Sequence, residues 1–266
     1  MTDVAEFRVP AVRLQPPADT RFELQVDGVT IPVTVSHERR PNARATIGAR
    51  GVLIRVPAGA SAATGEEHVA TLLRWALRTI RRDPQRYRIR PPRSYWDGQL
   101  LAIGGDRFRL HIGHAARATN GVRLDGLDPD GARLVRIVLS SRQTAAAHSH
   151  ALPRLVSRGL ALAKQPELRC RVEELNRQYF RQRLGTVRYR FTRSRWGSCN
   201  ASGNINVSTR LLLTPPPVFD YVLIHELAHL VVFDHSPRFW EVVAAAAPDY
   251  RRHQAWLHRH HHDCQF

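Results

Sequence analysis

Lysine is almost absent from this chain. Only Lys164 carries an ammonium group, and the other 39 of the 40 basic residues are arginine. Because only 23 residues are acidic, the formal net charge is +17, which attracts polyanions whatever their sequence. The arginines are scattered and form no basic tail, a pattern more typical of a solvated surface. Nucleic acid is therefore one candidate partner, and the arginine bias alone does not decide it.

Cysteines and long apolar runs are also scarce. Cys170, Cys199 and Cys264 are too few and too widely spaced for a disulfide framework. The N-terminal segment carries charged residues and no apolar run, so it does not resemble a secretory signal. No stretch reaches the ~20 apolar residues that a membrane helix needs. We expect a cytoplasmic protein with reduced thiols and no membrane partner.

Hydrophobic periodicity predicts an α+β fold with a β-rich N-terminal half. One amphipathic helix is predicted over residues 66–82, where apolar residues recur at three- and four-residue spacing. A hairpin is predicted around Asp27-Gly28, since this dipeptide favours tight turns between strands. The predicted strands are Phe22–Val26, Thr30–Val35, Gly51–Val56, Leu100–Ile103, Phe108–Ile112 and Leu134–Leu139.

The second half is mostly helical by the same criteria. Helical periodicity runs from about Arg142 to Leu184 with an interruption near Pro166. A further helix follows the prolines at 215–217 and runs through residues 225–229, and a last helical stretch covers about Phe239 to His258 with a break at Pro248. Short strands are predicted at Val187–Phe191 and Ile205–Val207. The predicted organisation is a loose leader at 1–20, a β-rich region with one helix at 21–140, and a mostly helical domain at 141–266 with a His-rich tail. We expect that tail to bind metals weakly and not to be the functional site.

The segment His225-Glu226-Leu227-Ala228-His229 carries the chemistry. His225 and His229 are four positions apart, so on a helix both imidazoles project from one face and can bind one metal ion. Glu226 lies about 100° further round the helix, where it can reach a metal-bound water rather than the metal. Residues 218–233 are otherwise almost entirely apolar, which is typical of a buried helix. Burying these three polar side chains without partners would be costly, and a metal ion with its water resolves that cost.

A catalytic zinc site usually takes three protein ligands and keeps one position open. His235 is the best candidate for the third ligand, although on a continuous helix it would face away from His229. The helix must therefore end first, and the segment Asp234–Pro237 favours a turn. Glu241 is the next candidate, and His253 is weaker.

Several motifs in order resemble the YgjP-like metallopeptidase family, which is related to the SprT and WLM zincins. The resemblance is dense from about Val187 to Leu257 and looser in the N-terminal half. The motifs that carry it are Arg195-Trp196-Gly197-Ser198-Cys199, Asn204-Ile205, Asp220-Tyr221-Val222, HELAHL at 225–230, His235-Ser236-Pro237-Arg238-Phe239-Trp240 and Pro248-Asp249-Tyr250.

The resemblance implies a zincin-like domain at 141–266 with a buried HExxH helix. It implies zinc bound by His225, His229 and His235, with Glu226 as the general base. One departure is Ser208, which stands where relatives usually carry asparagine, and this puts in doubt a hydrogen bond assigned to that asparagine.

The RWGSC segment can also be interpreted physically. Residues 187–199 could form the edge of a sheet to which an extended peptide adds as a further strand. Trp196 would form one wall of the cleft or would simply belong to the core. Arg193 or Arg195 could bind an anionic group or stabilise a developing oxyanion. Tyr250 is another candidate for oxyanion stabilisation. Cys199 is expected to be a packed residue rather than a ligand.

Three functions follow from this pattern, in decreasing order of preference. The first is a zinc metallopeptidase, in which Glu226 takes a proton from the metal-activated water. The second is a metal-dependent nucleoside triphosphate pyrophosphohydrolase, because arginine suits phosphate recognition. The third is a nucleic-acid-binding protein with a structural zinc, against which the presence of Glu226 argues, since a closed structural site has no use for a base.

Overall fold

A computed structural model describes residues 19–26, 29–48, 51–84, 93–192 and 194–266. The described residues form two compact units, one within residues 1–92 together with Arg259–Asp263 and one within residues 93–258 together with Cys264–Phe266. The described residues include no helix that is both long and apolar enough to cross a membrane.

The first unit contains one four-stranded sheet covered by one helix. The strands are β1 (Thr20–Val26), β2 (Val29–Glu38), β3 (Arg44–Gly48) and β4 (Gly51–Pro57), followed by α1 (Ala62–Arg82). They lie in the order β1-β2-β4-β3, with β2 and β4 parallel and the other neighbours antiparallel. The apolar face of α1 packs on this sheet and forms a core with it, as the three- and four-residue spacing predicts.

The predicted hairpin is present, since β1 and β2 pair antiparallel up to Val26 and Val29. Its turn, Asp27-Gly28, lies outside the described residues, as do most of the predicted 1–20 leader and residues 85–92.

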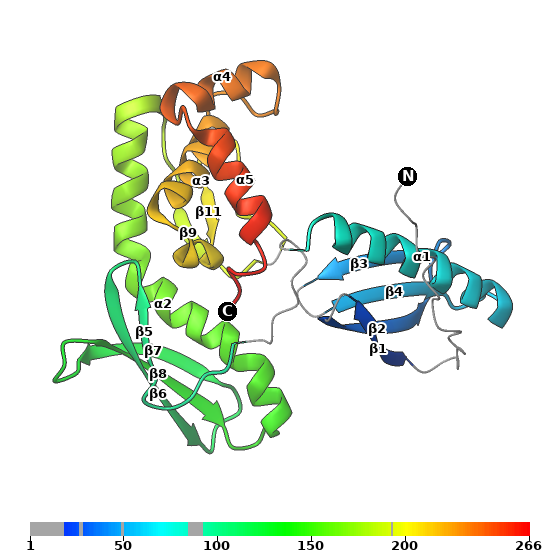
Figure 1. The fold of residues 1–266 in the computed structure, drawn as a ribbon. Coiled ribbons are helices and arrows are strands. Elements are labelled where there is room, and N and C mark those ends of the chain that lie inside the picture. Colours follow the sequence, from blue (N-terminus) through cyan, green and yellow to red (C-terminus); the bar gives the residue numbers. More distant parts are fainter. Residues whose placement is uncertain (1–18, 27–28, 49–50, 85–92, 193) are drawn as a thin grey trace. The chain divides into compact units, whose positions relative to one another are not determined.

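The second unit begins with a sheet of the same topology (Figure 1). Its order is β5-β6-β8-β7, again with a parallel central pair, and the helix that follows packs on β7 and β8 just as α1 packs on β3 and β4. The elements are β5 (Leu100–Ile103), β6 (Asp106–Ala115), β7 (Gly121–Leu127), β8 (Arg133–Ser140) and α2 (Ala145–Leu175). The chain therefore contains the arrangement of four strands and a helix twice.

Helix α2 continues through Pro166, where the sequence predicted an interruption. A proline inside a helix removes one backbone donor and costs about 3 kcal/mol. The helix persists because it buries apolar residues before and after Pro166 in two cores: Leu160 packs with the β5–β8 sheet, and Leu168 and Val172 pack with the C-terminal elements. One π-helical turn, η1 (Asn176–Phe180), ends it.

The C-terminal elements form a second layer on the other half of α2. The short strands β9 (Val187–Arg190), β10 (Gly197–Cys199) and β11 (Ile205–Ser208) form a sheet in the order β10-β11-β9, with β9 and β11 parallel. The 3-10 helix η2 (Thr209–Leu213) then leads to α3 (Pro216–Ala228), α4 (Pro237–Ala246) and α5 (Tyr250–His260). The break between α4 and α5 contains Pro248, as predicted.

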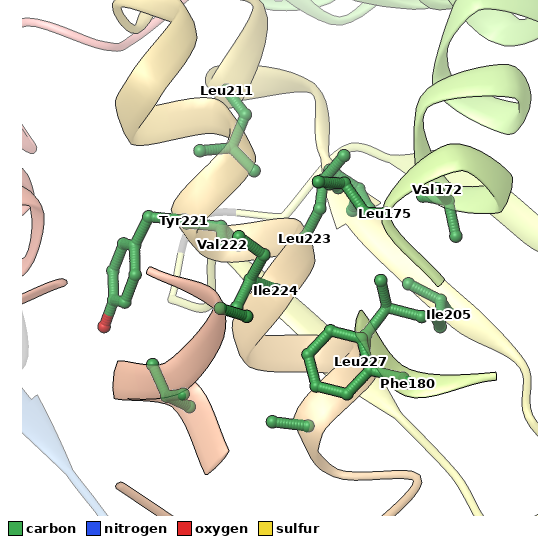
Figure 2. Packing of buried hydrophobic residues seen from close by; sticks show 14 of the residues in the cluster. Val172, Leu175, Phe180, Ile205, Leu211, Tyr221, Val222, Leu223, Ile224 and Leu227 are labelled. Carbon is green, nitrogen blue, oxygen red and sulfur yellow. The ribbon is translucent and has the colours of Figure 1, made fainter. Parts of the chain in front are cut away.

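The core of this layer surrounds α3. Figure 2 shows Leu223 and Leu227 of α3 among Val172 and Leu175 of α2 and Ile205 of β11. All five side chains are at most 3% exposed. This packing fixes α3 between α2 and the β9–β11 sheet.

The α+β class is confirmed, but the compact units do not divide where the sequence suggested a boundary, near residue 140. Strands β5–β8 belong to the second unit because their buried residues, such as Phe108 and Val135, form a core with Val156 and Leu160 of α2. The change from β to helical periodicity at residue 140 marks a change of secondary structure inside one unit.

Candidate metal centre and cleft

The segment 225–235 leaves helical geometry early enough to bring three histidines together. α3 ends at Ala228 and His229 is its C-cap, still with helical backbone angles, so His225 and His229 keep their spacing on one face. The helix therefore ends before Asp234–Pro237, the segment predicted to stop it. Asp234 Oδ1 then accepts a hydrogen bond from the Ser236 backbone (2.9 Å), and Pro237 opens α4.

His225, His229 and His235 each offer one ring nitrogen, and these atoms lie within 4.8 Å of one another. The Nε2 atoms of His225 and His235 are 3.2 Å apart. Two nitrogens bound to one tetrahedral zinc at ~2.0–2.1 Å would be about 3.3 Å apart. The described residues include Glu241 and His253, and neither belongs to this group.

Hydrogen bonding and burial determine the orientation and the protonation state of the histidine rings. His229 Nδ1 lies 3.2 Å from the Val232 carbonyl, an acceptor that fixes the tautomer and directs Nε2 outward. Burial, together with the neighbouring His229 and His235, lowers the pKa of His225 to about 4. Burial also lowers the pKa of His229. Both rings therefore stay neutral near pH 7, which is the form that binds a metal.

Glu226 is the most buried polar group of this segment, with 5% of its surface exposed. Burial raises the pKa of its carboxyl to about 8. Its neighbour on the sheet is Gly197, where an added Cβ would lie 2.7 Å from Glu226 Cγ and Cδ. Only glycine, which has no side chain, therefore fits at this position of β10 next to Glu226.

Cys199 lies on the same strand near this carboxyl. Burial, with a further contribution from Glu226, raises the pKa of the Cys199 thiol to about 11. A thiol that stays protonated near pH 7 is a poor metal ligand. Cys199 also lies outside the histidine group among the described residues, and it packs against the hydrophobic core.

Within the described part of the chain, one edge of the three-stranded sheet is open and the other is covered. Ser208 N donates to Trp196 O and Asn200 N donates to Asn204 O, so the alternating bonds of an antiparallel pair direct the backbone groups of Gly197 and Cys199 away from β11.

The opposite edge, that of β9, is covered by the carboxamide of Gln165 on α2. Gln165 Nε2 donates to Val187 O (2.8 Å), and Tyr189 N donates to Gln165 Oε1 (3.3 Å). The side chain thus makes the two bonds that a neighbouring strand would make, which leaves β10 as the open edge of this sheet.

Trp196 packs partly against the core and partly against a buried arginine. Arg210 Cζ lies 4.0 Å from the ring centroid of Trp196, and Arg210 Nε donates to the Cys264 carbonyl (2.8 Å). Arg210 is 4% exposed, and burial lowers its pKa to about 10. Arg210 therefore links Trp196, the residue that precedes Gly197, to the backbone of Cys264 near the C-terminus.

Aromatic rings surround the histidines. Phe239 stacks on His229 with ring centroids 4.6 Å apart, and Trp240 lies 5.9 Å from His235. Tyr250 stacks on Trp240 at 5.3 Å, and its hydroxyl accepts a hydrogen bond from Arg251 Nε (3.2 Å). The apolar segment after the predicted turn therefore forms one wall of the histidine group.

The other predicted residues are distributed as follows. Arg195 is exposed and lines a cavity on the β9–β11 sheet, and Arg193 lies outside the described residues. Ser208 donates to the Thr192 carbonyl and caps η2, so it has a local role of its own. Sequence reasoning missed Arg210 and Gln165, because their partners are 54 and about 24 positions away in the chain.

The comparison with protein-family models agrees with these motifs. The family model described as "YgjP-like, metallopeptidase domain" matches residues 41–260. A solved structure, the crystal structure of the metallopeptidase zymogen of Pyrococcus abyssi abylysin, is 25% identical over 34% of this chain and 90% of that chain, with a TM-score of 0.32. No curated protein matches the chain. Because the family model spans well over half of its length, this protein belongs to the YgjP-like metallopeptidase domain family, as its motifs predicted.

Proposed function

We propose that this protein is a zinc-dependent metallopeptidase with His225, His229 and His235 as the ligands. The observation that carries the proposal is the convergence of three imidazoles on one point beside a buried carboxyl. Two are held neutral by burial, and one is oriented by the Val232 carbonyl. His225 Nδ1 is buried without a hydrogen-bond partner among the described residues, so only Nε2 of this ring meets another polar group. Such a donor set fits zinc.

Zinc, when bound, supplies a Lewis acid that polarises a carbonyl and acidifies water. Glu226 acts as the general base: it accepts a proton from the attacking water and passes it to the leaving amine. Burial raises the pKa of this carboxyl, which makes its ionised form a stronger proton acceptor than an exposed carboxylate. Because Gly197 has no side chain, it leaves room for the carboxyl of Glu226.

The peptide binds in extended form along β10. The backbone groups of Gly197 and Cys199 point to the open edge and pair with the added strand. Because Gly197 borders Glu226, a peptide at this edge passes next to the base. Tyr250, which is hydrogen-bonded to Arg251, is a candidate donor to the oxyanion.

A second candidate, hydrolysis of nucleoside triphosphates at the same metal, is favoured by one observation. Arg190 and Arg195 line a cavity next to β10. We rank it second because the open strand edge suits a peptide backbone, whereas the side chains of Arg190, Ser198 and Asn206 lie on the face of the sheet that points away from Glu226. The nucleic-acid-binding alternative gains no such observation from the site.

The test is a parallel measurement of zinc and hydrolysis. The protein is stripped of metal, reloaded with zinc, and compared with His235→Ala and the matched control His253→Ala. We expect one zinc ion per chain in the parent and the control, loss of zinc from His235→Ala, and cleavage of an unfolded protein but not of nucleoside triphosphates. Binding below about half an equivalent in the reloaded parent would contradict the metal site. Zinc-dependent hydrolysis of triphosphates alone would favour the second candidate.

A further inference from the structure

A cavity of about 260 Å³ opens on the β9–β11 sheet beside β10. The side chains that give it its chemistry are two guanidinium groups, three hydroxyls and one amide, with no carboxylate among the lining residues that the structure describes. The lining consists of Arg190, Thr192, Arg195, Gly197, Ser198, Asn206, Val207 and Ser208. A hollow with two cations and no anion attracts a negatively charged group.

The guanidinium groups are available to a ligand. Arg190 uses Nε to bind Asn206 Oδ1 (3.2 Å), and Asn206 Nδ2 in turn donates to Ser198 Oγ (3.4 Å). These contacts orient Arg190 over β11 towards β10. Within the described part of the chain, the terminal nitrogens of Arg190 and the whole guanidinium of Arg195 have no acidic partner.

The cavity lies on the face of the sheet that points away from Glu226. Side chains alternate between the faces of a strand. Ile205 and Val207 point into the core with Val187, so Asn206, its neighbour Ser198 and Arg190 share the opposite face. Gly197 points to Glu226 instead. Arg190 is therefore placed to bind a part of the substrate other than its reacting carbonyl.

A peptide added at β10 sends every second side chain to this outer face. Side chains opposite each other on paired strands have Cβ atoms about 4.5–5.5 Å apart. A peptide side chain opposite Ser198 is therefore separated from Asn206 only by β10. The side chain of Arg190 extends over Asn206. A glutamate at that position can place its carboxylate between the two arginines.

We propose that this cavity is a subsite for an acidic side chain of the peptide substrate, whose carboxylate is bound by Arg190 and Arg195. The proposal rests on the proposed peptidase function and adds the substrate class: peptides with glutamate or aspartate at the position that faces Ser198. Hydrogen bonds to a charged group are stronger than neutral ones, and we expect a glutamate peptide to be preferred over its glutamine twin by about ten-fold or more.

The experiment uses the zinc-loaded full chain and pairs of peptides that differ only by glutamate or glutamine, scanned along the sequence. The readout is the ratio of the two kcat/KM values at each position. We expect one position with a strong glutamate preference, which weakens with salt. In the double variant Arg190→Gln, Arg195→Gln the ratio falls towards one, whereas the control Arg158→Gln, which changes an exposed arginine of α2, keeps it.

A second readout separates this proposal from the proposed function. The same peptide pairs are titrated into Glu226→Gln protein, and binding is followed without turnover. Cleavage of neutral peptides with no arginine-dependent glutamate preference overturns the subsite and leaves the peptidase intact. Absence of any cleavage together with arginine-dependent binding of the acidic peptide overturns the peptidase and supports the subsite. Inorganic phosphate that displaces the acidic peptide and binds more tightly than it does assigns the cavity to phosphorylated ligands and overturns the carboxylate.

Discussion

A Cβ atom at Gly197 would lie 2.7 Å from both Cγ and Cδ of Glu226, a separation that real Cβ atoms essentially never show. The glycine of β10 and the glutamate of α3 therefore fit together only because the glycine has no side chain. This contact places the base of the proposed reaction directly beside the strand that the substrate is proposed to join.

Gly197→Ala should displace Glu226 or push β10 away. Forcing a methyl group into a packed site costs about 1–3 kcal/mol, and a misplacement of about 1 Å near the reacting groups can cost ~10²-fold in rate. We therefore expect the rate of peptide hydrolysis to fall by about 10²-fold. The matched control is Gly113→Ala on β6, where an added Cβ meets nothing within 4 Å. Full activity in Gly197→Ala would show that the close contact has no role.

The raised pKa of Glu226 predicts a pH-dependent stability of the metal-free protein. The carboxyl titrates near 4.5 when unfolded and near 8 when folded. Because the folded state holds the proton more tightly, the stabilising contribution is complete below pH 4.5 and is lost as the pH rises towards 8. Wild type should therefore lose stability relative to Glu226→Gln over this range, by a few kcal/mol at most.

The measurement is urea unfolding of both proteins in the presence of a chelator, at pH 5 and at pH 8. Groups other than Glu226 titrate alike in the two proteins, so the difference isolates this carboxyl. A difference in unfolding free energy that stays constant between the two pH values would mean that the carboxyl is not buried as the structure has it.

Arg210 should be important for stability although it is far in sequence from its partners. Arg210→Ala removes a long side chain that is 4% exposed, with its contact to Trp196 and its bond to the Cys264 carbonyl. Lost packing and the lost hydrogen bond to the Cys264 carbonyl should lower the unfolding free energy by about 2 kcal/mol or more. The control Arg158→Ala, at an exposed position, should change it by less than about 0.5 kcal/mol. Equal stability of the two variants would contradict the bracing role.

Gln165 should protect the β9 edge. Gln165→Ala leaves Val187 O and Tyr189 N without their side-chain partner, at a cost of about 1–3 kcal/mol. Amide exchange at Tyr189 should accelerate, while Gln178→Ala, a change at an exposed glutamine, should leave it as in wild type. If the Tyr189 amide exchanges at the same rate in the Gln165 variant, the carboxamide does not cap this edge.

Local patterns in the sequence predicted much of the fold and the candidate site. Periodicity located α1, and the four-residue spacing of His225 and His229 predicted a shared face, although α3 ends at Ala228, before the Asp234–Pro237 segment that was expected to stop it. The requirement that the chain turn before His235 predicted the proximity of its Nε2 to that of His225. These predictions hold because they depend on residues that are close in the chain.

The rest depends on contacts that no local pattern reveals. The same arrangement of strands and helix occurs in both units, yet the sequences share no visible repeat, since a sheet requires only alternating apolar residues. Pro166 appeared to break a helix because the burial of Leu168 on its far side is a tertiary effect. The bonds of Arg210 and Gln165 join distant segments, and neither residue type suggests its partner.

The central claim is that Glu226 acts as a base and does not hold the metal, and Glu226→Gln tests it most directly. Zinc content and peptide hydrolysis are measured together for wild type, Glu226→Gln and the control Glu241→Gln on α4. We predict that all three proteins bind one zinc ion per chain and that only Glu226→Gln loses activity, by about 10²-fold or more. Full hydrolysis by zinc-loaded Glu226→Gln would contradict the account.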